Sequence, residues 1–245
     1  MLTRNYIKLI KSLSRKKGRD THGLFVVEGY KSIQELYQSG LDCKSVFVTS
    51  GNHKLDHLEL TVVTEKEMKT ISNLTTPPGY LAVFEIPKQS TIPHDGGIIV
   101  LDGVKDPGNL GTIIRLADWY GVSHIVCSRD TVDLFNPKCI QATMSSIARV
   151  QVYYRDIKEF LSETQRSVYI AHMDGESLYS TSIPENAAIV MGSESHGVSD
   201  SIKQLGTPVS IPSHSTHGAT ESLNVAIATA IITAHWKKSL SFTGK

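Results

Sequence analysis

The amino-acid sequence predicts an α/β protein whose larger, C-terminal part is built on a parallel β-sheet. Two observations predict this class: short Ile- and Val-rich runs alternate with segments of helical periodicity, and these runs are apolar almost throughout rather than at every second position. Strands that helices bury on both faces have this composition. With 245 residues, 40% of them hydrophobic and 20% charged, the chain can hold one large or two small globular domains.

Residues 1–88 predict a small α/β domain. A basic amphipathic pattern over 5–17 is typical of a helix, and 25–40 predicts a short strand followed by a helix that ends at Gly40. Further strands are expected at 45–50, 60–64 and 79–86, with a short helix at 65–72.

The second predicted domain, residues 97–245, follows a stretch at 89–96 that is rich in Pro, Gly and polar residues and lacks periodicity, as a linker does. Its strands are expected at 97–103, 124–128, 167–173, 187–193 and 207–212. Its helices are expected at 109–120, 138–147, 156–165, 199–204 and 222–238. No internal repeat interrupts this alternation, which predicts a parallel sheet covered on both faces.

Ligands of such sheets bind beyond the carboxyl ends of the strands. Three polar, glycine-containing loops follow predicted strands, at 102–109, 192–198 and 212–221, and their shared edge is the predicted binding site. The sequence has no GxGxxG dinucleotide fingerprint, no GxxxxGK[ST] phosphate loop and no GxSxG nucleophile elbow. These absences count against the commonest nucleotide-binding and hydrolase sites of α/β proteins.

The first loop opens a helix in the stretch LDGVKDPGNLGTIIRLADWYGV (101–122). Pro107 makes the turn and Asn109 is expected to cap the helix. Arg115 lies off the apolar face, and the residue one turn before it is Gly111, so its guanidinium is expected to lie along the helix toward Asn109. An arginine near the positive helix end predicts an anion or polar ligand; the alternative is an ordinary surface arginine.

In the second loop, IVMGSESHGVS, Gly192 and Gly197 flank Glu194. Glycine lets backbone approach a ligand closely. Glu194 is expected to accept hydrogen bonds from a ligand or to pair with Arg115; the alternative is a solvated turn residue.

The third loop ends in SLN, where Ser222 and Asn224 suit a helix start and could leave backbone donors open to an acceptor. The following helix carries an alanine at every fourth position from Ala226, which permits close helix contact within the domain or across a dimer. His214 and His217 lack a third ligand at suitable spacing, so no metal is expected.

Charge and cysteine content limit the setting. The net charge is +1, but residues 4–19 carry seven Lys and Arg and no acid, which predicts phosphate attraction or a merely solvated helix face. Three widely spaced cysteines count against a disulfide framework or zinc site and indicate a reducing compartment. Without a signal-peptide core or an apolar membrane span, a cytoplasmic protein is expected.

Three motifs, DPGNLGTIIRLAD, VMGSESHGVS and ESLNVAIATAI, give the chain a resemblance to the SpoU (TrmH-type) RNA 2′-O-ribose methyltransferases of the SPOUT class. They occur in the expected order and cover most of residues 98–238. The stretch GLFVVEGYKSIQELYQSG resembles the family's small substrate-binding domain, of an L7Ae-like ribosomal-protein fold. The resemblance implies a deep C-terminal trefoil knot, S-adenosylmethionine as cofactor, an RNA substrate and a homodimer.

The resemblance also implies roles for particular residues. The implied catalytic residues are Arg115, Asn109, Glu194, Ser222 and Asn224. The implied cofactor contacts are Gly192, Ile211, Leu223, Ser222 and Asn224. The expected RNA contacts are Arg115, Lys8, Lys11, Arg15, Lys16, Lys17 and Arg19. Because an arginine is costly to deprotonate near neutral pH, we expect Arg115 to hold a phosphate and stabilise alkoxide charge rather than to act as a base.

Some positions depart from the family pattern: Ser195 and Ser145 stand where glycine is common, and Ala148 stands where an aromatic residue is common. Because of these departures, the family resemblance does not indicate which RNA nucleotide is methylated. A separate N-terminal domain resembles the ribosomal-RNA members of the family more than the transfer-RNA members, and this resemblance favours ribosomal RNA as the substrate. The alternatives are a transfer-RNA 2′-O-methyltransferase, a non-catalytic RNA-binding or assembly factor, and an enzyme that methylates a base nitrogen.

Overall fold

The computed structural model describes residues 2–51, 55, 58–193, 195–215 and 222–238. The chain divides into two compact units: Met1–Gln89 together with Asp133–Arg149, and Ser90–Val132 together with Val150–Lys245. Neither unit is one continuous stretch of sequence. The domain limits 1–88 and 97–245 with a linker at 89–96 stay a prediction.

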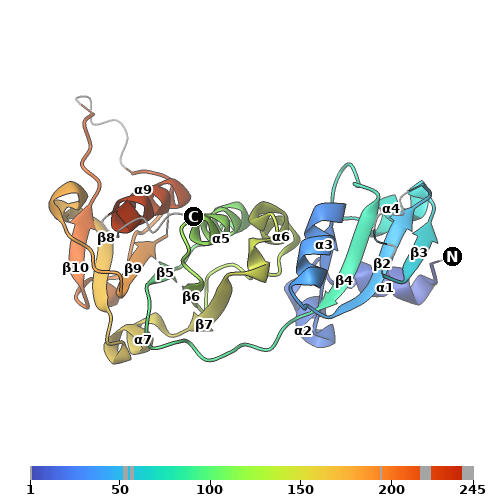
Figure 1. The fold of residues 1–245 in the computed structure, drawn as a ribbon, viewed down its shortest axis with the longest axis horizontal. Helices are drawn as coiled ribbons and strands as arrows, with labels where there is room; N and C mark the ends of the chain where they lie inside the picture. The colour runs from blue at the N-terminus through green and yellow to red at the C-terminus, as the bar shows by residue number, and fades with distance from the viewer. Residues whose placement is uncertain (1, 52–54, 56–57, 194, 216–221, 239–245) are drawn as a thin grey trace. The chain divides into compact units, whose positions relative to one another are not determined.

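The first unit contains a four-stranded mixed sheet in the order β1-β4-β2-β3 (Figure 1). Its strands are β1 (Leu24–Glu28), β2 (Cys43–Thr49), β3 (Leu60–Val63) and β4 (Tyr80–Glu85). Its helices from the N-terminal segment are α1 (Arg4–Ser12), α2 (Lys16–His22), α3 (Tyr30–Gln38) and α4 (Glu65–Ile71). One core joins α1 and α4 to the sheet through Ile10, Leu13, Val26, Phe47, Val63, Met68, Ile71, Leu81 and Val83. Apolar residues at helical spacing in α1 and at sheet positions in β1 and β4 account for this packing.

The single helix expected over 5–17 is wrong, because the chain forms two helices with a break after Ser12. The hydroxyls of Ser12 and Ser14 donate to the carbonyls of Leu9 and Lys11, both at 2.7 Å, which competes with helical bonding. A side chain at Gly18 would place its Cβ 2.1 Å from the Ser12 carbonyl oxygen. The glycine therefore lets α2 fold back against the end of α1.

The same unit contains α6 (Pro137–Thr143) and the 3₁₀ turn η1 (Ser146–Ala148). α6 contacts β1, and the rings of Phe25 and Phe135 lie 4.6 Å apart. The helix expected over 138–147 ends earlier, because Met144 and Ser145 adopt φ values of 47° and 74°. Left-handed backbone at two successive non-glycine residues stops an α-helix.

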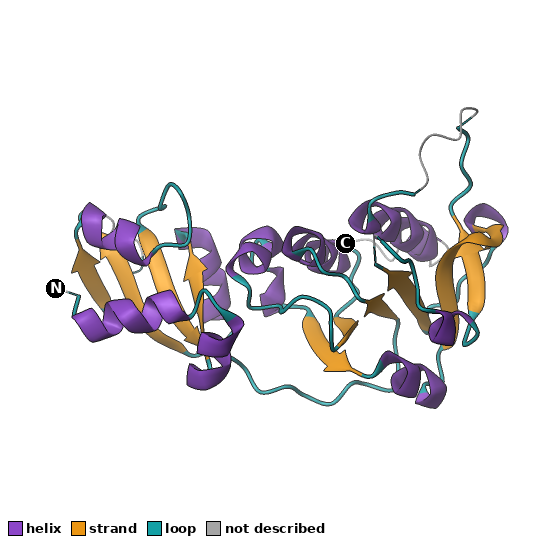
Figure 2. Ribbon diagram, turned by 180° about the vertical axis from the view of Figure 1, so that it is seen from behind, coloured by secondary structure: helices purple, strands orange, loops and turns teal. Residues whose placement is uncertain are grey.

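The second unit contains a six-stranded sheet in the order β10-β8-β9-β5-β6-β7, and every pairing in it is parallel (Figure 2). Its strands are β5 (Ile98–Asp102), β6 (His124–Ser128), β7 (Gln151–Arg155), β8 (Ser167–Ser177), β9 (Ala187–Gly192) and β10 (Thr207–Ser210). The predicted parallel sheet is confirmed. Strand β7 was not expected, because its buried residues Val152 and Tyr153 are adjacent and polar residues flank them.

Helices cover this sheet. They are α5 (Pro107–Trp119), α7 (Ile157–Glu163), α8 (Asp200–Lys203) and α9 (Val225–Lys238), with the 3₁₀ turn η2 (Leu178–Ser180). One core packs α7 and α8 against alternate strand residues, among them Ile98, Val100 and Val190. Helices α5 and α9 contact each other, and α9 contacts β9. Helix α9 begins at Val225 rather than at the expected residue 222.

Arg166 fixes the segment that enters this unit. Its side chain is buried, and its guanidinium donates to the carbonyls of Gly96 at 2.7 Å, Pro93 at 2.7 Å and Asp95 at 3.0 Å. The Tyr153 hydroxyl lies 3.2 Å from the Ser90 hydroxyl. Residues 90–96 therefore pack as part of the second unit rather than hanging free.

Candidate functional site

The carboxyl ends of β5 and β9 meet in the middle of the parallel sheet. Asp102, the last residue of β5, is in register with Gly192, the last residue of β9. The loops after these strands therefore leave the sheet side by side. This is the place where the chain order reverses, since β6 and β7 extend the sheet on one side of β5 and β8 to β10 extend it on the other.

The loop after β5 is held by a polar network. Gly103 has φ +74°, a conformation that favours glycine, and its N–H donates to the Ser128 hydroxyl at 2.9 Å. Ser128 donates to the Asp130 carboxylate at 2.6 Å, and Lys105 donates to the same carboxylate at 2.5 Å. These two hydrogen bonds, Lys105 first, hold the pKa of the Asp130 carboxyl below its usual value. The network fixes the loop that leads into α5.

Helix α5 begins two residues earlier than expected. Asp106 is the N-cap, and its carboxylate accepts the N–H of Asn109 at 2.8 Å, with Pro107 in the first turn. The expectation that Asn109 caps the helix is therefore wrong. Asn109 instead lies in the first turn, where its side-chain oxygen accepts a hydrogen bond from the Asn224 amide at 3.0 Å.

Arg115 lies farther along the helix than expected. It is the ninth of the thirteen residues of α5, so it is not close to the positive helix end, and the macrodipole does not explain it. It is exposed, and it lies about 9 Å along the axis from Asn109. Because helical side chains lean toward the N-terminus, the guanidinium can still extend toward the loops at the sheet edge.

The loop after β9 folds tightly back on itself. Ser193 and Gly197 exchange two backbone hydrogen bonds of 3.0 and 2.9 Å. A Cβ at Gly192 would lie 2.0 Å from the Gly197 carbonyl carbon, so only glycine fits there. Glu194, which the family resemblance implies as a catalytic residue of this loop, lies outside the described residues. The close backbone approach predicted for Gly192 is present, although in this structure it serves the loop itself.

Asp102 joins this loop to the first one, a role that sequence reasoning missed. Its carboxylate accepts the backbone N–H of Ser199 at 2.8 Å, at the start of α8. The signal was available, because an acid that ends a buried strand directly before a glycine is placed at the ligand edge of the sheet. Asp102 positions the second loop and need not contact a ligand itself.

The third loop brings the SLN segment to α5. Asn224 caps α9, since its side-chain oxygen accepts the N–H of Ala226 at 2.9 Å and that of Ile227 at 3.3 Å. Its amide nitrogen makes the bond to Asn109. Ser222 and Leu223 precede it and are exposed, and Ile211 follows β10 and is partly buried. Residues 216–221, including His217, lie outside the described residues.

The structure thus brings Asn109 and Asn224 together and leaves Arg115, Ser222 and Leu223 exposed on the same unit. Amides, hydroxyls and backbone N–H groups lie at this edge beside the charged side chains of Asp102, Lys105 and Arg115. Such groups orient and polarise a bound molecule. Among the described residues, no cluster of three His, Cys, Asp or Glu side chains could hold a metal ion.

The basic segment lies on the first unit, and one of its members is not available for RNA. Lys8, Lys11, Arg15, Lys16 and Lys17 are exposed. Arg19 is buried, donates to Asp133 through two nitrogens and donates to the Leu13 carbonyl at 2.8 Å. The expectation that Arg19 contacts RNA is therefore wrong, because its charge is already paired inside the unit.

This arrangement, a parallel sheet with three loops and an interhelical amide pair at one edge, defines a SPOUT-type α/β methyltransferase unit. The family model described as the SpoU rRNA methylase family matches residues 97–234, and the chain belongs to that family. A second model, described as the MRM3-like substrate-binding domain, matches residues 4–82. The family expected from the three sequence motifs is thereby confirmed.

Three individual proteins are similar to this chain over nearly its whole length. A TrmH-family RNA methyltransferase structure from Porphyromonas gingivalis is 36% identical, with a TM-score of 0.88 over 97% of this chain and 99% of that one. An AdoMet-bound rRNA methyltransferase from Sinorhizobium meliloti is 27% identical, with a TM-score of 0.88 over 98% and 97%. The 23S rRNA (guanosine(2553)-2′-O)-methyltransferase RlmP of Bacillus subtilis is 28% identical over 94% of each chain.

Proposed function

We propose that this protein transfers a methyl group from S-adenosylmethionine to a ribose 2′-hydroxyl of ribosomal RNA. Family membership supports methyl transfer, the name of the Bacillus subtilis relative supports ribose 2′-O chemistry on ribosomal RNA, and the AdoMet-bound relative supports the methyl donor. The observation that carries the proposal is the Asn109–Asn224 hydrogen bond. It joins the first and third motifs at the ligand edge of the sheet.

The residues at this edge suit the cofactor. Gly192 leaves no side chain at the end of β9, and Ile211 and Leu223 offer apolar surface at the two ends of the third loop, with Leu223 46% exposed. Backbone groups together with apolar side chains can hold an adenosyl moiety while Ser222 and Asn224 contribute polar contacts. When bound, S-adenosylmethionine supplies a methyl group that its sulfonium activates.

The chain's own residues must then orient the RNA. Arg115 holds a phosphate of the target nucleotide and stabilises the negative charge that develops on the 2′-oxygen. Asn109 and Asn224 hold α5 and the start of α9 in register, so that the ribose meets the methyl group in line. Glu194 is a further residue of the proposed catalytic site. Phosphate contacts on the first unit come from Lys8, Lys11, Arg15, Lys16 and Lys17.

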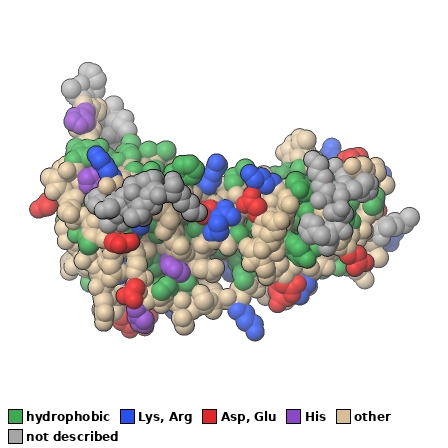
Figure 3. Space-filling model, viewed as in Figure 1, with side chains coloured by type: hydrophobic (Ala, Val, Ile, Leu, Met, Phe, Trp, Pro, Cys, Tyr) green, Lys and Arg blue, Asp and Glu red, His purple; other side chains and the backbone are tan. Residues whose placement is uncertain are grey.

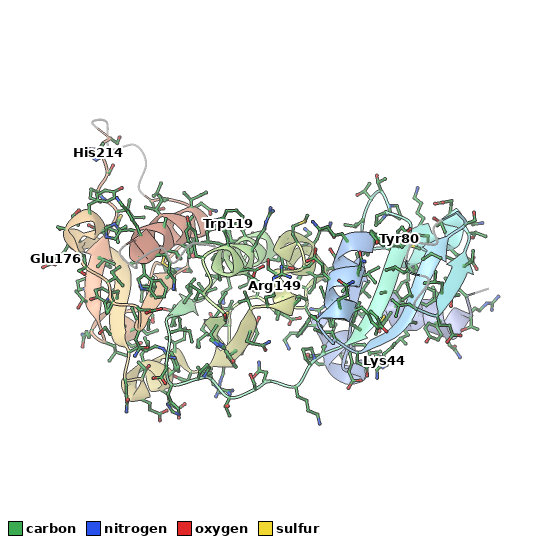
Figure 4. All side chains as sticks on the ribbon, in the orientation of Figure 1. Lys44, Tyr80, Trp119, Arg149, Glu176 and His214 are labelled. Atoms are coloured by element: carbon green, nitrogen blue, oxygen red, sulfur yellow. The ribbon has the colours of Figure 1, made fainter. Side chains whose placement is uncertain are left out.

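The second unit also supports assembly as a homodimer. Trp119 at the end of α5 is 83% exposed (Figure 4), and Ile227 in α9 is 53% exposed. Apolar surface over α9 is visible in Figure 3. Contiguous exposed apolar surface marks sites of association between chains. We expect light scattering to give twice the chain mass, and the W119E I227E variant to give the single-chain mass.

Two further features belong to the same proposal. The C-terminal segment forms the trefoil knot of the family, and the N-terminal domain predicted at residues 1–88 has the L7Ae-like fold. A cytoplasmic site of action suits ribosomal-RNA methylation. No helix within the described ranges has the length and apolarity to cross a membrane.

The decisive experiment is methyl transfer from labelled S-adenosylmethionine to ribosomal and transfer RNA from cells that lack the gene, followed by alkaline hydrolysis. A methylated 2′-hydroxyl blocks cleavage of the chain. Label in alkali-resistant dinucleotides from ribosomal RNA is the expected result. The same label from transfer RNA would show that transfer RNA, and not ribosomal RNA, is the substrate. Label in mononucleotides would indicate a base methyltransferase. Cofactor binding without any transfer would indicate an RNA-binding factor that has lost the reaction.

A further inference from the structure

The first unit contains a cavity that the methyl-transfer site does not use. It measures about 260 Å³ and lies between the end of β1, the residues after α4, and α6. Its walls are mostly apolar, and four polar side chains contribute to the lining. The lining residues are Val26, Glu28, Asn73, Leu74, Pro137, Lys138, Ile140, Gln141 and Ala142. Apolar walls with a few polar groups are the usual form of a small-ligand site.

Glu28 is the unusual member of this lining. Glu28 is buried, with 8% of its surface exposed. It forms no ion pair with any other residue that the structure describes. The carboxylate accepts the Ser72 hydroxyl at 2.5 Å on one oxygen and the Asn73 N–H at 2.7 Å on the other. Each carboxylate oxygen has two acceptor positions, so each retains capacity for one more donor. A carboxylate held this rigidly is a fork-shaped acceptor for two neighbouring N–H groups.

The opposite charge lies at the rim. Lys138 is exposed in the first turn of α6, and Asn73 and Gln141 add exposed amides that can donate or accept. The cavity therefore offers an acceptor inside, apolar walls between, and a cation at the mouth. A nucleotide whose base carries adjacent donors has the complementary order: donors on the base edge, a flat ring, and then a phosphate.

We propose that this cavity binds one unpaired guanine nucleotide of the RNA substrate. Guanine presents N1–H and N2–H side by side on its Watson–Crick edge, which matches the two oxygens of Glu28, while Lys138 meets the attached phosphate. Single-stranded bases are read in this way, by apolar or stacking contacts with the ring and hydrogen bonds to the base edge. The proposal rests on the proposed RNA substrate and adds a nucleotide that the protein reads without methylating it.

The walls are fixed firmly enough for recognition. Buried Arg19 donates to Asp133, and Phe25 packs on Phe135, which together hold the segment before α6 against β1. The hydrogen bonds of Glu28 hold Asn73 and Leu74 on the other side. Recognition sites need such support, because a loosely held acceptor loses its selectivity.

The test is titration of the full chain with 5′-GMP, 5′-AMP, 5′-UMP and inorganic phosphate, followed by two-dimensional amide NMR. We expect shifts at β1 and α6 with GMP and at least about tenfold weaker binding of UMP, as one bidentate contact confers. Glu28→Gln keeps an acceptor for the Asn73 N–H and should abolish the preference for GMP over UMP. Equal binding of all four probes, or shifts confined to other residues, would overturn the proposal.

Methyl transfer gives an independent readout. Ala142→Leu, which fills the cavity, and Lys138→Ala should each raise the KM for ribosomal RNA several-fold and leave kcat within about twofold. Lys66→Ala, an exposed lysine of α4, is the matched control and should change neither. Unfolding midpoints of the variants verify that they fold. If wild-type protein binds GMP selectively but methylates no RNA, the proposed activity fails while the nucleotide site stands. If it methylates RNA and Ala142→Leu folds with an unchanged KM, the nucleotide site is wrong.

Discussion

Asn109 and Asn224 lie 115 positions apart in sequence and share a hydrogen bond of 3.0 Å between their side-chain amides. Asn224 simultaneously caps α9 by accepting two backbone N–H groups. One residue therefore both starts a helix and ties it to α5. The relationship explains why two uncharged amides, which cannot act as acid or base, belong to a site for group transfer.

Replacement of Asn224 should separate these two roles. We expect Asn224→Ala to lower the free energy of unfolding by about 1 kcal/mol through loss of the cap and to reduce kcat about 10- to 100-fold through misalignment. Asn224→Asp keeps an acceptor for the cap and should retain most stability, but it cannot donate to Asn109. A double-mutant cycle with Asn109→Ala, measured by urea unfolding and single-turnover methylation, should give a non-zero coupling. Strict additivity would show that the pair does not act together.

Arg115 should matter for the reaction and not for the fold, because it is exposed on α5. Arg115→Ala is expected to lower kcat/KM by about 10²- to 10³-fold with an unchanged unfolding midpoint, and Arg115→Lys should recover part of the loss as a point charge without the planar fork. Arg155→Ala, also exposed, is the matched control. A kcat/KM unchanged in Arg115→Ala would make this residue an ordinary surface arginine.

The network around Asp130 should respond to acid. Because Lys105 and Ser128 hold the pKa of this carboxyl below its usual value, its stabilising effect is present above the unfolded pKa of about 3.9 and is lost as pH falls through the folded pKa. Both side chains of the ion pair are more than half exposed, so the contribution is under about 1 kcal/mol.

Urea unfolding of the wild type and of Asp130→Asn should therefore differ at neutral pH, and the difference should shrink on acidification. NMR titration of the carboxyl carbon gives the folded pKa directly. A folded pKa at or above the ordinary aspartate value would contradict the network.

Ser145 is expected to be replaceable by glycine with a gain in stability. It has φ +74° and is buried, in a conformation that costs a non-glycine residue about 1–2 kcal/mol. Since glycine also adds entropy to the unfolded chain, the net gain for Ser145→Gly should be up to about 1 kcal/mol, measured by urea unfolding. Ser12→Gly, in α1 with ordinary helical backbone, should instead destabilise. Loss of stability in Ser145→Gly would mean that its side chain offsets the strain.

The basic segment should govern the salt dependence of RNA binding. Neutralising Lys8, Lys11 and Lys17 to Gln is expected to reduce the slope of log K against log salt by about 2–3 units. Arg19→Ala should behave differently, because it leaves Asp133 without its partner inside the unit, and it should lower the unfolding free energy by about 3–5 kcal/mol. A slope that the triple variant leaves unchanged would remove the segment from the RNA interface.

Much of the second unit could be predicted from the sequence, because apolar strands such as β5 and β9 carry their own signal. The positions of the loops at the sheet edge followed from the parallel arrangement alone. The predictions that were wrong concerned local features, and each error has a physical cause. The cap of α5 was assigned to Asn109, although Asp106 directly before Pro107 satisfies the same rule better.

Other features could not be read from one sequence. The pairing of Arg19 with Asp133 joins residues 114 positions apart, so a basic run gave no sign that one member is buried. Likewise, β7 is short and polar at both ends, and only its neighbour β6 makes it a strand. For Asp102, the sequence indicates a place at the ligand edge of the sheet, but its hydrogen-bond partner Ser199 is 97 positions away and is visible only in the structure.

The hydrogen bonds from Arg166 to the carbonyls of Pro93, Asp95 and Gly96 decide where a C-terminal fragment of this chain can begin. A fragment that begins at Ile98 would leave a buried guanidinium without its acceptors and would be prone to aggregate. One that begins at Ser90 keeps all three carbonyls and the hydroxyl partner of Tyr153. A C-terminal fragment of this enzyme should therefore start before the proline- and glycine-rich segment and not after it.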